Sequence, residues 1–234
     1  MKTIGLIGGM SWESTVPYYT ILNEEVKKAL GGYHSAKILL YSVDFDEIEK
    51  DQVAGNWEHM GETLGNIART LQDAGADAIV LCTNTMHKVA PQIESKISVP
   101  FLHIADATAE AIQEKGMKRV ALLGTRYTMS EGFYRDRLTC NGLEVQVPNE
   151  QEQSTIHRVI FEELVLGILR DESRNELLAI IDRLANDGAQ CIILGCTEIG
   201  MLVKQEDTDV MLFDTVEMHA KKAARFMLDN EKKA

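Results

Sequence analysis

The sequence of 234 residues lacks the features of several protein classes. It has 24 lysine and arginine residues against 36 aspartate and glutamate residues, and this net charge of -12 argues against a duplex nucleic-acid partner. No run approaches the roughly 20 apolar residues of a membrane helix, and the N-terminal residues do not form a signal peptide. We therefore expect a cytoplasmic protein that binds neither nucleic acid nor membrane.

Cysteine is scarce, and its spacing excludes common metal and redox motifs. The four cysteines include no C-x-x-C pair, and the chain has no H-E-x-x-H segment. His87 follows Cys82 by five residues, which is outside the usual ligand spacing, so zinc held by Cys82, His87 and Cys196 is disfavoured. We expect no metal, and in a reducing compartment the cysteines are expected to be thiols.

The glycine turn near the N-terminus is not a nucleotide-binding motif. The segment from Gly5 to Trp12 matches neither G-x-G-x-x-G nor a P-loop, so we expect no nicotinamide or nucleotide cofactor. Because Met10 and Ser11 follow the predicted first strand, they are candidates for lining a ligand site.

Short apolar runs alternate with longer amphipathic ones along the chain. The runs lack polar alternation, which predicts strands buried on both faces, and the alternation with helices predicts a mainly parallel α/β sheet. The predicted strands are 3–8, 36–43, 78–82, 101–104, 119–124, 191–195 and 211–213. The clearest predicted helices are 17–30, 60–74, 156–169 and 175–186.

The chain also repeats itself. Residues 4–8 resemble residues 120–124. Residues 74–83 likewise resemble residues 187–197, and each segment of this second pair ends in Cys-Thr. The repeat predicts two similar domains, with Cys82 and Cys196 beyond the carboxyl ends of equivalent strands, where ligands of open α/β sheets bind. If these domains face each other across a cleft, the two thiols flank one ligand, as proton transfer between the two faces of a carbon atom requires.

Each cysteine begins a polar segment suited to binding an anion. Residues 82–85 read Cys-Thr-Asn-Thr, and residues 195–198 read Gly-Cys-Thr-Glu. We expect residues 83–85 to begin a helix that binds a carboxylate and lowers the pKa of the Cys82 thiol. In the second segment, Thr197 is expected to cap a helix and Glu198 to lie in its first turn.

These two segments together resemble the paired signatures of the aspartate/glutamate racemase family, and within it the bacterial broad-specificity amino-acid racemases. Further similarities are Gly-Gly-Met-Ser-Trp-Glu-Ser-Thr at 8–15, Ser-Val-Asp-Phe at 42–45 and Phe-Glu-Glu-Leu at 161–164. The resemblance implies two pseudo-symmetric α/β domains, 1–103 with 214–234 and 104–213, with the active site in the cleft between them. It also implies catalysis without pyridoxal phosphate, metal or nucleotide.

The resemblance further implies residue roles. Cys82 would exchange a proton with the D-enantiomer of an amino acid and Cys196 with the L-enantiomer. Substrate binding falls to Thr83, Asn84, Thr85, Thr197 and Glu198, together with Met10, Ser11, Gln52 and Leu166.

One departure from the family pattern concerns the substrate. Relatives that prefer acidic substrates bind the side-chain carboxylate with basic residues, whereas this chain has Gln52 and Leu166 near those positions. We therefore expect a broad specificity that includes neutral amino acids. Separately, we expect a homodimer, since symmetric dimers are common among soluble enzymes. Alternatives are a racemase specific for aspartate or glutamate, a related isomerase such as maleate isomerase, and a two-lobed binding protein without catalytic activity.

Overall fold

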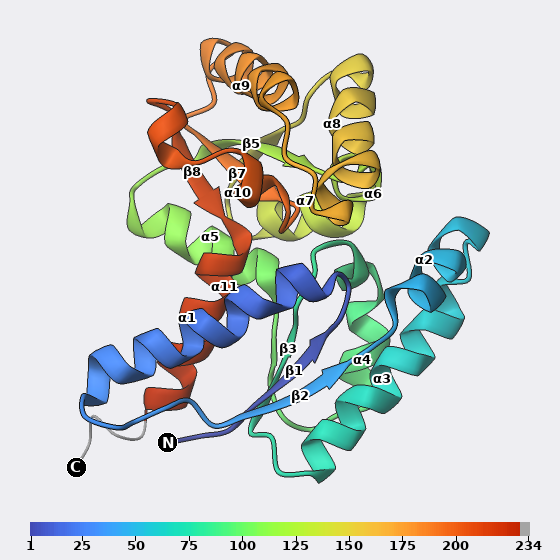
Figure 1. Ribbon diagram of the computed structural model, residues 1–234, viewed down its shortest axis with the longest axis vertical. Coiled ribbons are helices and arrows are strands. Elements are labelled where there is room, and N and C mark those ends of the chain that lie inside the picture. The colour runs from blue at the N-terminus through green and yellow to red at the C-terminus, as the bar shows by residue number, and fades with distance from the viewer. Residues whose placement is uncertain (230–234) are drawn as a thin grey trace. The chain divides into compact units, whose positions relative to one another are not determined.

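The computed structural model describes residues 1–229 and divides the chain into two compact units. Unit 1 comprises Met1–His103 and His219–Ala234, and unit 2 comprises Ile104–Met218. Each unit is built on one parallel sheet of four strands with helices on its faces (Figure 1). The α/β class and the presence of two similar domains, both expected from the sequence, are confirmed.

Unit 1 contains the first sheet, with the strand order β2-β1-β3-β4. Its elements before the first crossing of the chain are β1 (Ile4–Gly8), α1 (Trp12–Leu30), β2 (Ile38–Ser42), α2 (Phe45–Ala54), α3 (Trp57–Asp73), β3 (Ala78–Leu81), the 3-10 helix η1 (Thr85–Val89), α4 (Ala90–Ser95) and β4 (Phe101–Leu102). The helix α11 (Thr215–Leu228) begins in unit 2 and ends in unit 1.

Unit 2 repeats this plan with the strand order β6-β5-β7-β8. Its elements are α5 (Ile104–Glu114), β5 (Arg119–Gly124), α6 (Arg126–Ser130), α7 (Gly132–Cys140), β6 (Glu144–Gln146), α8 (Glu150–Glu162), η2 (Leu164–Leu166), α9 (Asp171–Asn186), β7 (Cys191–Gly195), α10 (Ile199–Leu202), η3 (Gln205–Asp207) and β8 (Met211–Asp214).

Alternation along the inner strands gives each sheet two apolar faces. In unit 2, Leu123 and Leu194 pack with α8 and α9, whereas Leu122 and Ile193 pack with α5 and α7. In unit 1, Ile7 of β1 packs with α3 on one face of the sheet. Helices on both faces explain why the inner strands are continuously apolar.

The structure differs from the sequence expectations at several elements. The edge strand β2 is half-buried to exposed, because it has a neighbour on one side only. β6 was not predicted. The predicted helix 156–169 ends at Glu162, because the backbone of Glu163 leaves the helical conformation and its buried carboxylate bonds Ser173 and Arg158.

The return of the chain to unit 1 lies at His219 rather than at the predicted position 214. The first turn of α11 belongs to unit 2, because the Thr215 hydroxyl donates to the Leu194 carbonyl (2.9 Å) and Asp214 accepts from the Val216 N–H (2.8 Å). The final residues of the predicted segment, 230–234, lie outside the described residues.

Candidate active site

The two cysteines lie at equivalent positions of the two sheets. β3 and β7 are the third strands in their sheet orders, and Cys82 and Cys196 follow them directly. Each third strand pairs with the first strand of its unit, β1 or β5, on one side. The strand order reverses beside these first strands, and crevices at such reversals bind ligands in doubly wound sheets.

Unit 1 presents a fully buried Cys82 within a tightly bonded turn. The Cys82 N–H donates to the Ile7 carbonyl (2.9 Å), which ties the residue to β1. Burial raises the pKa of the Cys82 thiol well above its ordinary value. The sequence expectation of a lowered pKa is therefore wrong for this structure, because loss of hydration disfavours the thiolate.

The polar residues after Cys82 are buried but do not cap a regular helix. Thr83, Asn84 and Thr85 are all buried, and the segment continues as the short 3-10 helix η1, which has no side-chain cap. Gln52 of α2 reaches the same segment, since its amide donates to the Met86 Sδ atom (3.1 Å). The structure thus brings Gln52 to the segment that follows Cys82.

The turn after β1 holds the other predicted residues of unit 1. Gly9 has φ +94°, and a side chain there would lie 2.3 Å from the Val43 carbonyl oxygen, so this close approach requires glycine. Met10 packs in the core on the α3 side, and Ser11 caps α1 by accepting from the Ser14 N–H (3.3 Å).

Unit 2 presents Cys196 beside a buried carboxylate. The Cys196 thiol donates to Glu198 Oε2 (3.0 Å), and the Thr197 hydroxyl donates to the same oxygen (2.6 Å). The pKa of Cys196 is raised, first by burial and then by the charge and hydrogen bond of Glu198, while the backbone N–H groups of Glu198 and Ile199 act in the opposite direction.

These contacts change the roles expected for two residues. Glu198 stands at the N-cap position of α10, without a side-chain cap, and Thr197 bonds Glu198 instead of capping the helix. The contact between Glu198 and Cys196 was not predicted from the sequence, although the Cys-Thr-Glu spacing was the available signal. A carboxylate that accepts from a thiol can take up its proton, so Glu198 is placed to receive the Cys196 proton although its charge raises the pKa of the thiol.

Leu166 is the predicted site residue that the structure leaves on a surface. It lies in η2, and its side chain is 66% exposed. Its part in substrate binding stays a prediction.

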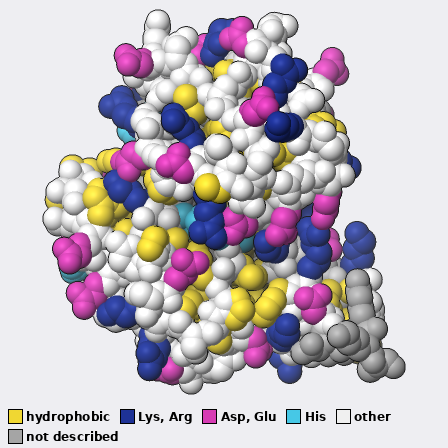
Figure 2. All heavy atoms as spheres, turned by 180° about the vertical axis from the view of Figure 1, so that it is seen from behind, with side chains coloured by type: hydrophobic (Ala, Val, Ile, Leu, Met, Phe, Trp, Pro, Cys, Tyr) yellow, Lys and Arg dark blue, Asp and Glu magenta, His cyan; other side chains and the backbone are white. Residues whose placement is uncertain are grey.

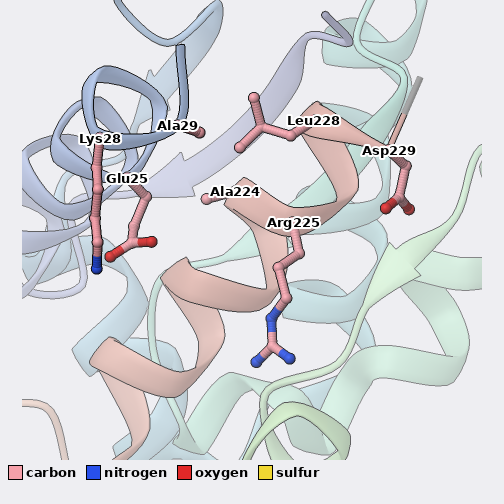
Figure 3. A pocket seen from close by; sticks show the side chains of 7 residues that line it. All are labelled: Glu25, Lys28, Ala29, Ala224, Arg225, Leu228 and Asp229. Carbon is pink, nitrogen blue, oxygen red and sulfur yellow. The ribbon is translucent and has the colours of Figure 1, made fainter. Parts of the chain in front are cut away.

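A surface pocket of unit 1 is separate from these residues. A cavity of about 470 Å³ lies between α1 and the end of α11, and Figure 3 shows charged side chains of both signs around it. It is lined by Glu25, Lys28, Ala29, Ala224, Arg225, Leu228 and Asp229. None of the predicted site residues lines it.

The surface shown in Figure 2 carries basic and acidic side chains interspersed, and no single basic patch dominates that face of the described residues. Within residues 1–229, no helix is both long and apolar enough to cross a bilayer.

Comparison with known proteins decides the family. The model of the Asp/Glu/hydantoin racemase family matches residues 7–223. The chain belongs to this family. This racemase is therefore an isomerase, as the sequence signatures implied.

Three relatives show how far the similarity extends. A candidate Asp/Glu racemase from Yersinia pestis is 53% identical, with 97% of this chain and 100% of that chain covered and a TM-score of 0.92. An aspartate racemase homologue from Pyrococcus horikoshii is 37% identical, with coverage of 97% and 99% and a TM-score of 0.84. The broad specificity amino-acid racemase RacX of Bacillus subtilis is 25% identical, with coverage of 91% and 92%.

Proposed function

We propose that this racemase interconverts L- and D-amino acids by a two-base mechanism in which Cys82 and Cys196 act on opposite faces of the substrate Cα. The observation that supports it most strongly is the equivalent position of the two thiols in the two sheets. The proposal requires the carboxyl edges of the two sheets to face one substrate.

The contact of Cys196 with Glu198 gives the proton transfers a definite order. For an L-amino acid, the Cys196 proton passes to Glu198, and the thiolate then removes the Cα proton while the Cys82 thiol protonates the opposite face. The enzyme then holds protonated Glu198, a Cys196 thiol and a Cys82 thiolate, which is the form that accepts the D-enantiomer. Each turnover therefore prepares the enzyme for the reverse reaction.

The mechanism uses no pyridoxal phosphate, so the protein itself stabilises the carbanion. Hydrogen bonds already in place before the reaction contribute most to such stabilisation, particularly where water is excluded. We assign the α-carboxylate and α-ammonium to the buried polar residues Thr83, Asn84, Thr85 and Thr197. Met10 and Ser11 complete the unit 1 side of the proposed site.

We further propose broad specificity that includes neutral amino acids. Gln52 is buried and uncharged, and its amide already bonds the segment that follows Cys82. A glutamine can bond a polar side chain but cannot neutralise a carboxylate, so acidic substrates gain no ion pair from it. The name of the relative RacX is consistent with this specificity.

Assembly as a homodimer in the cytoplasm is also part of the proposal. Trp12, Val16 and Tyr19 form an exposed apolar stripe on α1 (64%, 51% and 58% exposed), of the kind that marks protein interfaces. Light scattering of Val16→Glu, with Tyr33→Glu as an exposed control, should show a monomer for the first variant only.

The cytoplasmic location is consistent with the state of the cysteines. All four cysteines are free, as a reducing compartment would keep them.

The experiment that tests the function is Cα proton exchange in deuterated water. Reduced, metal-stripped protein is mixed with a panel of L- and D-amino acids, followed by NMR and by chiral chromatography. Exchange with inversion of neutral amino acids supports the proposal, and inversion of aspartate or glutamate alone overturns the broad specificity. Absence of both across the panel would overturn the racemase and favour a related isomerase or a binding protein.

A further inference from the structure

Three buried histidines gather next to the segment that follows Cys82. His87 lies in η1, His103 follows β4, and His219 lies in α11. The ring centroid of His87 is 4.4 Å from that of His103 and 5.9 Å from that of His219. From the sequence, His87 was weighed only as a zinc ligand, and His219 had no predicted role.

Hydrogen bonds to backbone carbonyls fix which nitrogen carries the proton in two of these rings. His87 Nδ1 lies 2.8 Å from the Thr83 carbonyl oxygen, so this nitrogen carries the proton and donates. His219 Nε2 donates to the Leu102 carbonyl (2.5 Å), and its Nδ1 accepts from the Tyr18 hydroxyl (2.9 Å). The bonds of His219 use both of its ring nitrogens, so that ring is no metal ligand here.

Two of the rings stand where the chain leaves and re-enters unit 1. His103 is the last residue before the crossing to unit 2, and His219 is the first residue after the return. Both pack on His87, so the three rings join β4 and α11 to η1. His87 is thus packed against both rings.

The bond from His87 restrains Cys82 from its C-terminal side. The Cys82 N–H is held by the Ile7 carbonyl, and the Thr83 carbonyl is held by His87 Nδ1. The Cα atoms of Cys82 and Thr83 therefore lie between two anchored peptide groups, and the Thr83 N–H between them donates to the Leu81 carbonyl (2.9 Å). These bonds limit the directions that the Cys82 thiol can take. The anchor before Cys82 is a strand of the sheet, whereas the anchor at the Thr83 carbonyl is a single side chain.

We propose that His87 is a positioning residue that holds Cys82 in the geometry required for proton transfer at Cα, with His103 and His219 supporting its ring. The inference rests on the two-thiol function proposed above. A displacement of about 1 Å at a reacting group can cost on the order of 100-fold in rate. Loss of the bond to Thr83 should therefore lower kcat by about 10- to 100-fold.

The test compares His87→Leu with His87→Asn. Leucine fills much of the space of the ring without a donor, whereas the asparagine amide can replace the Nδ1–H donor, so His87→Asn should recover most of the activity. Phe101→Leu is the matched control, because Phe101 packs on His87 at a centroid distance of 5.4 Å but does not bond Thr83. This control should stay close to wild type.

Isotope effects separate positioning of Cys82 from a general loss of structure. In His87→Leu, the kinetic isotope effect of α-deuterated substrate on kcat/KM should increase for the reaction in which Cys82 removes the proton. The family resemblance assigns this role to Cys82 in the conversion of the D- to the L-enantiomer. The isotope effect should not rise in the opposite direction. An unchanged effect in both directions, or equal rises in both, overturns the proposal.

Two readouts do not depend on racemisation. Alkylation of Cys82, followed by mass spectrometry, should be faster in His87→Leu and unchanged in His87→Asn and Phe101→Leu. The nitrogen NMR spectrum of wild-type His87 should show a protonated Nδ1. If the wild type does not racemise but alkylation changes in this pattern, the two-thiol function fails, and the restraint of Cys82 by His87 still stands. Unchanged alkylation or an unprotonated Nδ1 overturns that restraint.

Discussion

Replacing Glu198 with glutamine should make Cys196 easier to ionise and yet slow racemisation. One oxygen of the Glu198 carboxylate accepts from both the Cys196 thiol (3.0 Å) and the Thr197 hydroxyl (2.6 Å). An amide oxygen can accept the same bonds, so Glu198→Gln preserves much of the local geometry. It removes the negative charge that raises the pKa of the thiol, and it removes the group that takes up the thiol proton.

The two consequences have opposite signs. The pKa of Cys196 should fall, because a charge that opposes the thiolate is lost. Racemisation should fall by about 10²- to 10⁴-fold, the usual contribution of a positioned acid or base, which corresponds to about 3–5 kcal/mol of activation free energy. Glu198→Asp retains a carboxylate and should lie between wild type and Glu198→Gln.

The assay follows Cys196 alkylation and racemisation on the same samples across pH. Glu163→Gln is the matched control, because Glu163 is another buried carboxylate of unit 2 that bonds Arg158 and Ser173 rather than a cysteine. It should leave the alkylation profile of Cys196 unchanged. Racemisation at the wild-type rate in Glu198→Gln would refute the role of Glu198 as proton acceptor.

Four further predictions concern the two thiols, the packing of α10 and the substrate side chain. Cys82→Ala and Cys196→Ala should each lower kcat/KM by about 10³-fold or more with unchanged circular dichroism, and racemisation retained in either one contradicts the two-thiol mechanism. Because raised thiol pKa values favour the uncharged form, the reactive thiolate increases with pH, so kcat/KM should increase from about pH 6 to about pH 9; a decrease over this range contradicts the assignment. Gly200→Ala places a methyl group 2.3 Å from the Asp214 carboxylate and should lower the free energy of unfolding by about 1–3 kcal/mol, and an unchanged Tm would show that the Asp214 side chain moves aside without cost. Leu166→Lys should increase kcat/KM for aspartate relative to alanine if this residue contacts the substrate side chain, and an unchanged ratio removes it from the site.

The positions of Cys82 and Cys196 could be predicted from the sequence, but their electrostatic surroundings could not. Both were identified from the repeated strand followed by Cys-Thr, a local pattern that any parallel α/β sheet places at its carboxyl edge. Their electrostatic surroundings were not identified, because a pKa depends on burial and on neighbours that the fold supplies. The expected helix N-terminus after Cys82 became a short 3-10 helix, and burial decided the sign of the shift.

The misread elements have a similar cause. β6 (Glu144–Gln146) has three residues and no apolar run, so only its pairing with β5 makes it a strand. The helix predicted to reach residue 169 stops at Glu162. The carboxylate of the next residue, Glu163, accepts hydrogen bonds from Arg158 and from Ser173, which lies ten residues further along the chain. Tertiary contacts of this kind override local periodicity.

By itself, the sequence determined the fold class, the inner strands, the repeated plan and the two candidate cysteines, because these depend on hydrophobic periodicity and on residues adjacent in the chain. Only the tertiary structure decided that Glu198 accepts from Cys196, that Gln52 bonds the segment after Cys82, and that His87, His103 and His219 pack together. His87 and His219 are 132 positions apart along the chain, and periodicity contains no information about such a pairing. Their contact arises because α11 returns to the unit that β1 began.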